Sequence, residues 1–335
     1  MMAIDLPFVW AFIIAFAVLA YVVLDGFDLG IGILFPFLRD EGERDTAMNS
    51  VAPIWDGNET WLVLGGGGLF ATFPLAFAVV MPALYMPISA MLLGLVFRGV
   101  AFEFRWKTQR AKPVWDWAFT LGSLTAALCQ GIALGALVQG VEMSDRAYSG
   151  GWWDWLTPFS LLTGLAVVVG YTLLGAAWLI WKTEGGLQDY AYRTARVTGG
   201  ATLALIGVVS LWTPFLDPAY MQRWFAWPAI LLVMPVPLLV LAAAYGLFKG
   251  IERRRDAQPF LSALALFVLS FVGLGISFYP HIVPPGLTIR EAAAPDNSLA
   301  FLLAGAIVLI PVILIYTAHA YWVFRGKIGS GEGYH

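Results

Sequence analysis

Nine apolar segments recur along this chain, and they constrain its fold more than any other feature of the sequence. A helix needs about 20 apolar residues to cross the hydrocarbon core of a bilayer. The segments cover approximately residues 7–37, 58–77, 79–103, 116–139, 157–181, 198–216, 225–248, 259–280 and 299–324. Only 12% of the 335 residues are charged, whereas an ordinary soluble domain has about 25%. We therefore predict an all-α, polytopic membrane protein of about nine transmembrane helices.

The boundary between the second and third segments is the least distinct. Apolar residues are nearly continuous over 62–100, and Pro74, Pro82 and Pro87 each fit a turn or a kink. One helix over this whole stretch would be too long for a single crossing, so we expect two helices joined by a tight turn near residues 73–78.

The basic residues define the orientation. Of the 19 Lys and Arg residues, 15 lie in one set of alternating loops and the tail, and three lie in the opposite set. Cytoplasmic loops carry the excess of positive charge, so we expect the N-terminus outside and the C-terminus in the cytoplasm. Residues 1–8 contain no Lys or Arg, which argues against a cleavable signal. The longest loops, 38–57 and 281–298, are too short for a soluble core, so we expect residues 1–335 to form one integral membrane domain.

Two carboxylates lie within the first apolar segment. Asp25 and Asp28 are three residues apart and share a helix face. Gly26 and Gly30 form a small-residue step that allows another backbone to approach. Ionisable residues inside a span are costly and usually functional. The alternative is a helix that ends early, with both carboxylates wetted at the interface.

Two more carboxylates, Asp56 and Glu59, stand at the start of the second segment. Acidic residues at a helix start also cap it and favour its dipole, and that alternative is about equally good. The glycines at 65–68 permit close packing and are not followed by the Lys-Ser or Lys-Thr of a phosphate loop.

Arg98 lies late in the third segment, where its side chain could extend to the cytoplasmic headgroups. Successive helices, however, cross the bilayer in opposite directions. This places five residues of neighbouring helices in its cytoplasmic half: Asp25, Asp28, Asp56, Glu59 and Arg98. Four carboxyls around one guanidinium cannot all be ionised cheaply in a poorly solvated place. We therefore predict a proton pathway through these five residues that opens to the cytoplasm.

Few residues are suited to hold a metal or cofactor. Haem in a helical bundle takes axial ligands from inward-facing side chains. Of the three histidines, His281 and His335 lie outside the spans, and His319 fits a polar residue near a helix end. Cys129 has no partner for a disulfide. No basic stripe indicates nucleic-acid binding. We expect this chain to bind no cofactor and any redox groups to sit on a partner.

The motifs resemble subunit II of the cytochrome bd-type quinol oxidases, including the variant called cyanide-insensitive oxidase. The similarity is densest over residues 20–117. It is carried by residues 25–30 (DGFDLG), 49–62 (NSVAPIWDGNETWL), 65–71 (GGGGLFA), 97–103 (FRGVAFE) and 115–117 (WDW), with 311–318 (PVILIYTA) further on.

The resemblance implies a haem-free scaffold of two four-helix bundles plus a peripheral helix, in a bacterial cytoplasmic (inner) membrane. Its partner would be subunit I, which carries two b-type haems and haem d, or a b-type substitute, and the quinol site. A structural quinone and a small single-helix accessory subunit can also be present in this family. By the matching motifs, Asp25 and Asp56 are the positions associated with proton transfer, with Glu59 and Arg98 beside them.

Two other functions fit the residues. A proton-coupled secondary transporter would also place carboxylates within its spans, although the odd helix count and the lack of inverted repeats argue against it. An inert assembly scaffold would need Asp25 and Asp56 for stability alone.

Overall fold

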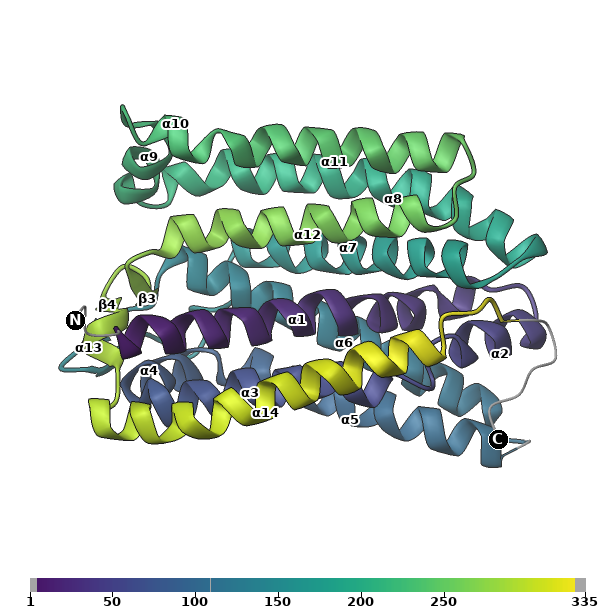
Figure 1. Ribbon diagram of the computed structural model, residues 1–335, viewed down its shortest axis with the longest axis horizontal. Helices are drawn as coiled ribbons and strands as arrows, with labels where there is room; N and C mark the ends of the chain where they lie inside the picture. The colour runs from purple at the N-terminus through teal and green to yellow at the C-terminus, as the bar shows by residue number, and fades with distance from the viewer. Residues whose placement is uncertain (1–4, 109, 329–335) are drawn as a thin grey trace.

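The computed structural model describes residues 5–108 and 110–328, and most of this part of the chain is helical. The long helices run side by side along the molecule (Figure 1). They are α1 (Leu6–Leu34), α3 (Trp55–Thr72), α5 (Tyr85–Lys107), α6 (Lys112–Gln139), α7 (Pro158–Lys182), α8 (Gly185–Trp212), α11 (Pro235–Glu252), α12 (Ala257–Phe278) and α14 (Asp296–Val323). The prediction of an all-α membrane protein is confirmed. Eight helices of the described chain are long and apolar enough to span a bilayer, and counting α3 with α4 as one span gives nine.

Short elements connect the long helices at the two ends of the molecule (Figure 1). One end, which we call the basic end because most Lys and Arg residues gather there, holds η1 (Phe35–Phe37) and α2 (Glu41–Asn49). The far end holds α4 (Pro74–Ala83), η2 (Thr213–Phe215), α9 (Pro218–Phe225), α10 (Ile230–Val233) and α13 (Ile289–Ala292), with strands β1 (Met143–Ser144), β2 (Ala147–Tyr148), β3 (His281–Val283) and β4 (Leu287–Thr288). The strands form two antiparallel hairpins, β1–β2 and β3–β4.

The predicted boundary between the second and third spans needs correction. The turn exists, but α3 ends at Thr72 and α5 starts only at Tyr85, so the expected spans 58–77 and 79–103 are both misplaced. The residue before a proline avoids helical dihedrals, and Phe73 accordingly has φ −130° and ψ 62°. Pro74 then starts α4, which turns 120° away from α3. The freed carbonyl of Thr72 accepts a hydrogen bond from the Ala294 amide at 2.8 Å.

Two other regions differ from expectation. The span expected at 225–248 begins at Ile230, because Pro228 interrupts the helix after α9. The loop expected at 38–57 contains α2, which is polar and therefore lacks an apolar period. Its cap could have been recognised in the sequence: the Asp40 carboxylate accepts from the Glu43 amide at 2.8 Å, and Glu43 accepts from the Arg39 amide at 2.9 Å.

Helix α1 lies at the centre and packs against α3, α6 and α7. The predicted small-residue step is confirmed, since Gly26 and Gly30 both face α7. A Cβ at Gly30 would lie 1.8 Å from the Tyr171 carbonyl oxygen, so only glycine allows the two helices to approach this closely. The half of α1 that bears Asp25 and Asp28 is thereby held in the core.

The remaining helices follow in chain order. Helices α5, α6 and α7 pack in sequence, and α7, α8, α11 and α12 form a second group. Helix α14 lies at the edge, with contacts to α1 and α3 (Figure 1). The division into two four-helix bundles plus a peripheral helix is compatible with these contacts and stays an interpretation.

Candidate functional site

Arg98 on α5 is completely buried and surrounded by carboxylates from two other helices. Its Nη2 lies 2.6 Å from Asp25 Oδ1, and its Nη1 donates to Asp25 Oδ2 at 2.9 Å. Asp28 Oδ2 lies 3.8 Å from Nη2, and Glu59 Oε2 lies 3.8 Å from Nη1. We call these four residues the Arg98 cluster.

Close helix packing brings the cluster together. Asp25 and Asp28 lie on one face of α1, which continues to Leu34, and both side chains have no exposed surface. Helices α5 and α6 cross in backbone contact beside Arg98, where a Cβ at Gly122 would lie 2.5 Å from the Gly94 carbonyl oxygen and 3.0 Å from the Arg98 nitrogen. Two alternatives weighed from the sequence are therefore wrong: α1 does not end early, and Arg98 does not extend out to the headgroups.

The exposure of the carboxylates differs. Asp25 and Asp28 are fully buried, whereas the Glu59 side chain is 28% exposed. Glu59 is therefore the member of the Arg98 cluster that reaches the surface of the chain. Asp28 Oδ1 has no hydrogen-bond partner among the described residues, so one carboxyl oxygen of the buried pair is left open.

Asp56 lies outside the Arg98 cluster. Its side chain is exposed in the first turn of α3, three residues before Glu59. Among the ion pairs of the described residues, the carboxylate partners of Arg98 are Asp25, Asp28 and Glu59. The expectation of four carboxyls facing one guanidinium was wrong by one residue, and the place of Asp56 fits the helix-start alternative.

Asn58 and Tyr321 complete the polar contacts, and sequence reasoning missed both. The Asn58 amide nitrogen donates to Asp28 Oδ2 at 2.8 Å and to the Leu24 carbonyl at 3.2 Å. Its Oδ1 accepts from the Tyr321 hydroxyl of α14 at 2.9 Å. Asn58 could have been found, since it stands between Asp56 and Glu59, but nothing local marks Tyr321 as their neighbour across the fold.

A second polar group continues from the cluster toward the far end. Tyr21, one helical turn before Asp25 on α1, accepts a hydrogen bond from the Gln130 amide at 2.6 Å. Gln130 Oε1 in turn accepts from the Tyr171 hydroxyl at 2.7 Å. This row joins α1, α6 and α7 by side chains that can carry or orient a proton.

Aromatic rings enclose Arg98 on the side of the basic end. Trp55 and Phe102 are stacked with centroids 4.8 Å apart, and Arg98 Cζ lies 5.8 Å and 5.9 Å from their centroids. Phe102 also contacts Phe119 edge-on at 5.0 Å. The rings stabilise the guanidinium by cation–π contact and exclude water from this side.

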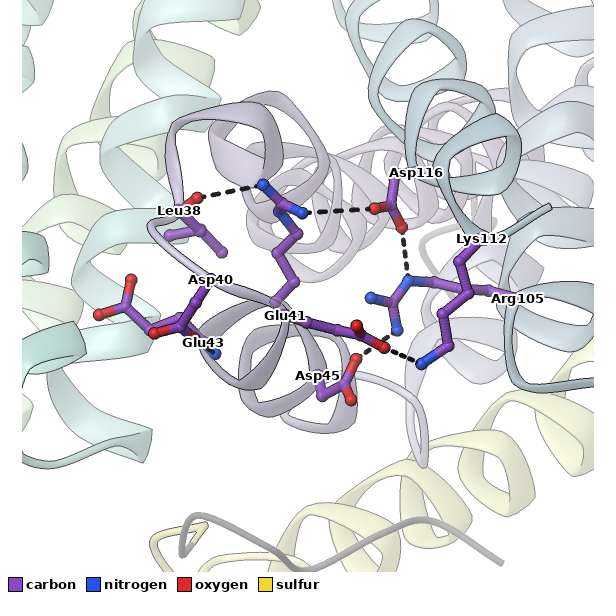
Figure 2. Close-up of polar contacts among 9 residues, drawn as sticks. Leu38, Asp40, Glu41, Glu43, Asp45, Arg105, Lys112 and Asp116 are labelled. Carbon is purple, nitrogen blue, oxygen red and sulfur yellow. Dashed lines mark hydrogen bonds and ion pairs between the residues drawn. The ribbon is translucent and has the colours of Figure 1, made fainter. Parts of the chain in front are cut away.

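Arg105, two turns further along α5, forms a second buried ion-pair group (Figure 2). Its Nε lies 2.6 Å from Asp116 Oδ1 at the start of α6, and its Nη1 lies 2.5 Å from Asp45 Oδ1 on α2. Arg44 lies 3.7 Å from Asp116, and Lys112 pairs with Glu41 beside them. We call Arg105, Asp45, Asp116 and Arg44 the Arg105 cluster. It ties the basic ends of α2, α5 and α6 together.

The histidines do not form an axial pair of ligands within the described residues. His319 is exposed on α14, 6.0 Å from the Trp322 ring, and His281 lies in β3 at the far end. His335 lies outside the described residues. Within the described residues, no group of three or more His, Cys, Asp or Glu side chains is placed to hold a metal ion.

The chain was compared with known proteins. Residues 6–324 match the family model for cytochrome bd terminal oxidase subunit II. Cytochrome bd-I ubiquinol oxidase subunit 2 of Escherichia coli (strain K12) is 31% identical over 96% of this chain and 95% of its own. Cytochrome bd ubiquinol oxidase subunit 2 of Bacillus subtilis (strain 168) is 29% identical over 96% of this chain and 97% of its own.

A solved structure of bd oxidase from Geobacillus thermodenitrificans contains a chain of the same fold. The TM-score is 0.72 at 18% identity, and the alignment covers 96% of this chain and 99% of the other. The family match, the identity over nearly the whole length and the shared fold agree with each other. This chain belongs to the cytochrome bd terminal oxidase subunit II family, and it is a component of a quinol oxidase complex.

Proposed function

We propose that this chain is the haem-free scaffold of a quinol:oxygen oxidoreductase and provides its proton-uptake route. It would lie in a bacterial cytoplasmic (inner) membrane with its basic end toward the cytoplasm, because positive loops stay on that side. The partner would be the haem-bearing subunit I. Haems b and d, or a b-type substitute, on that partner would supply electron transfer and oxygen reduction.

The Arg98 cluster is the observation that supports the proton route. The Arg98 guanidinium can offset the charge of one of the three carboxylates. Ionising the other two would be costly, because Asp25 and Asp28 have no exposed surface. A set of three carboxylates around one cation offers groups that can take up and give up a proton within the helices. Reduction of oxygen to water consumes protons, and a group that binds and releases them from one side of the membrane conserves energy as proton-motive force.

The exposure of the side chains supports a direction for proton entry. Asp56 is exposed and would collect protons from water at the basic end. Glu59, 28% exposed and 3.8 Å from Arg98, would pass them to the buried pair Asp25 and Asp28. The row Tyr21, Gln130 and Tyr171 extends from there into the bundle. Proton transfer between such groups needs hydrogen-bond distances or one intervening water.

The comparisons give no support to the secondary transporter considered from the sequence. An inert scaffold remains the relevant competing function, because loss of a buried ion pair also lowers stability. A structural quinone and a small accessory subunit are predicted from the family resemblance. We assign no binding site for either of them among the described residues.

The first experiment is to tag this chain, purify it from its native membrane in mild detergent, and identify its partners. The reduced-minus-oxidised spectrum and quinol-dependent oxygen uptake are recorded on the same sample. A large haem-bearing partner with oxygen uptake is expected. A colourless chain purified alone from active membranes would contradict the proposal.

The second experiment tests the proton route with turnover per assembled haem. Asp25→Asn and Asp28→Asn are expected to lower turnover by at least about tenfold. Glu59→Gln and Asp56→Asn should have smaller effects, since water can partly replace an exposed carboxylate. If all four variants keep full turnover per haem and only the amount of assembled complex falls, the proton route is contradicted and the inert scaffold is the function that explains the result.

A further inference from the structure

We propose that Tyr321, on the C-terminal helix, is a positioning residue that fixes the orientation of the Asn58 amide toward Asp28. The inference rests on the proposed proton route and assigns to α14 a part in it. Neither residue carries a charge, and α14 otherwise lies at the edge of the molecule (Figure 1).

The hydrogen bonds of Asn58 define which end of its amide faces the cluster. Asp28 Oδ2 and the Leu24 carbonyl are both acceptors, at 2.8 Å and 3.2 Å, so the NH₂ group must face them. The Tyr321 hydroxyl donates to the amide oxygen at 2.9 Å on the other side. A flipped amide would present its oxygen to two acceptors, whereas in the observed orientation the Tyr321 hydroxyl adds a third contact by donating to the amide oxygen.

This orientation matters for the chemistry of Asp28. An NH₂ group facing Oδ2 leaves Oδ1, which has no hydrogen-bond partner among the described residues, as the oxygen where a proton can be held. A flipped amide oxygen would instead favour a protonated Oδ2 that donates to it. Tyr321 therefore acts on Asp28 through Asn58, by supporting the amide orientation that leaves Oδ1 as the oxygen that exchanges protons.

The end of α14 is held so that Tyr321 stays in place. The buried Lys182 of α7 donates to the carbonyl oxygens of Phe324 and, at 3.1 Å, of Gly326. The Ile328 amide donates to the Lys182 carbonyl at 2.8 Å. These contacts fasten the chain just after Tyr321, whereas most residues of α14 further from this end are exposed.

The test is a double-mutant cycle in the assembled oxidase, read as quinol-dependent oxygen uptake per haem. Tyr321→Phe removes only the hydroxyl and should lower turnover about twofold to tenfold, the range of one lost hydrogen bond. Tyr316→Phe is the matched control, because Tyr316 is exposed on the same helix and should have no effect. Asn58→Leu should lower turnover at least as much as Tyr321→Phe.

The decisive value is the effect of Tyr321→Phe in the Asn58→Leu background. If Tyr321 acts through Asn58, the second change adds nothing. A purely structural role of Tyr321 would lower turnover by the same factor in both backgrounds and would overturn the inference. Turnover unchanged in Tyr321→Phe would also overturn it.

The pH profile gives a second readout. Asp28 is faced by Asp25 on α1, Glu59 on α3, Arg98 on α5 and Tyr321 on α14. Changing how Asp28 is hydrogen-bonded should displace the pH profile of turnover in Tyr321→Phe, whereas a loss of active complex scales every point equally. Asp28→Asn separates the two proposals. If Asp28→Asn slows turnover and Tyr321→Phe does not, only this inference fails; if neither does, this inference fails and Asp28 is also removed from the proposed proton route.

Discussion

Helix α5 carries two buried arginines, Arg98 and Arg105, and their surroundings differ in one respect. Both guanidinium groups have no exposed surface, and both are paired with more than one carboxylate. Two of the three described carboxylate partners of Arg98, Asp25 and Asp28, are themselves fully buried, whereas Asp45 and Asp116 beside Arg105 are 31% and 19% exposed. Water can therefore reach both carboxylates that pair with Arg105, whereas in the Arg98 cluster it reaches Glu59 but not Asp25 or Asp28.

The difference indicates two roles for the same residue type. In the Arg105 cluster, the carboxylates are partly exposed to solvent, and the group fastens α2 to α5 and α6 (Figure 2). In the Arg98 cluster, the role that we propose is proton uptake, because water does not reach Asp25 and Asp28 and cannot solvate their charges. Between the two lies the aromatic layer that includes Phe102, Phe119 and Phe35, and it keeps water at the basic end away from Arg98.

The largest effect is expected at Arg98. Arg98→Gln would leave Asp25 and Asp28 buried without a cation, and breaking a buried pair in this way costs about 3–5 kcal/mol of stability. The measurement is the thermal midpoint and the yield of the assembled complex. An Arg98→Gln complex as stable as the parent would show that the carboxylates are already neutral there.

Arg105→Gln should destabilise the complex less, by about 1–3 kcal/mol, because its carboxylates regain water. Added salt screens partly exposed ion pairs, so it should reduce the difference in stability between Arg105→Gln and the parent. The difference in stability between Arg98→Gln and the parent should stay nearly unchanged. Equal salt dependence of the two variants would remove the distinction drawn between the clusters.

The smallest effect is expected at the edge of the Arg105 cluster. The hydrogen bond and charge of Lys112 hold the pKa of the exposed Glu41 carboxyl below its ordinary value of 4.5. Because the folded chain favours the carboxylate, the pair stabilises it above the ordinary pKa, and this contribution is lost as the pH falls through the lowered folded value.

Thermal midpoints of Lys112→Gln and the parent, measured across pH, test this. The difference should be constant near neutral pH, start to shrink as the pH falls below the ordinary pKa of 4.5, and vanish once the pH is below the lowered folded pKa. Lys107→Gln is the matched control. Lys107 pairs with Glu103 on the exposed surface of the same helix, α5, so that pair joins no second helix. A difference that persists at low pH would indicate that Lys112 acts through contacts other than Glu41.

Much of the fold follows from local features of the chain. The lengths of the apolar segments predict the spans because a helix must satisfy its own backbone in lipid. The boundaries failed near Pro74 and Pro228, where a proline can bend a helix or end it, and only packing decides which. Helix α2 was missed because its residues are polar and its evidence is a capping pattern rather than periodicity.

The composition of the site was predicted in part for the same reason. Asp25, Asp28, Glu59 and Arg98 were identified because charges within apolar segments are conspicuous one residue at a time. Asp56 has the same local signal as Glu59, but it faces outward, and a helix start alone does not say which face is buried. Tyr321, Tyr21 and Gln130 are neutral, so nothing in their own segments marks them, and Asn58 is marked only by its place between Asp56 and Glu59.

The sequence by itself therefore determined that this chain lies in a membrane, about how often it crosses, and which charges could be buried, because those properties depend on stretches of neighbouring residues. The tertiary structure decided which of the charges meet. Glycines at 30 and 122 set how closely α1, α7, α5 and α6 approach, and that spacing brings Arg98 to Asp25 across 73 residues of sequence. It also brings Tyr321 to Asn58 across 263. Contacts of this kind arise from the packing of whole helices, which no local pattern records.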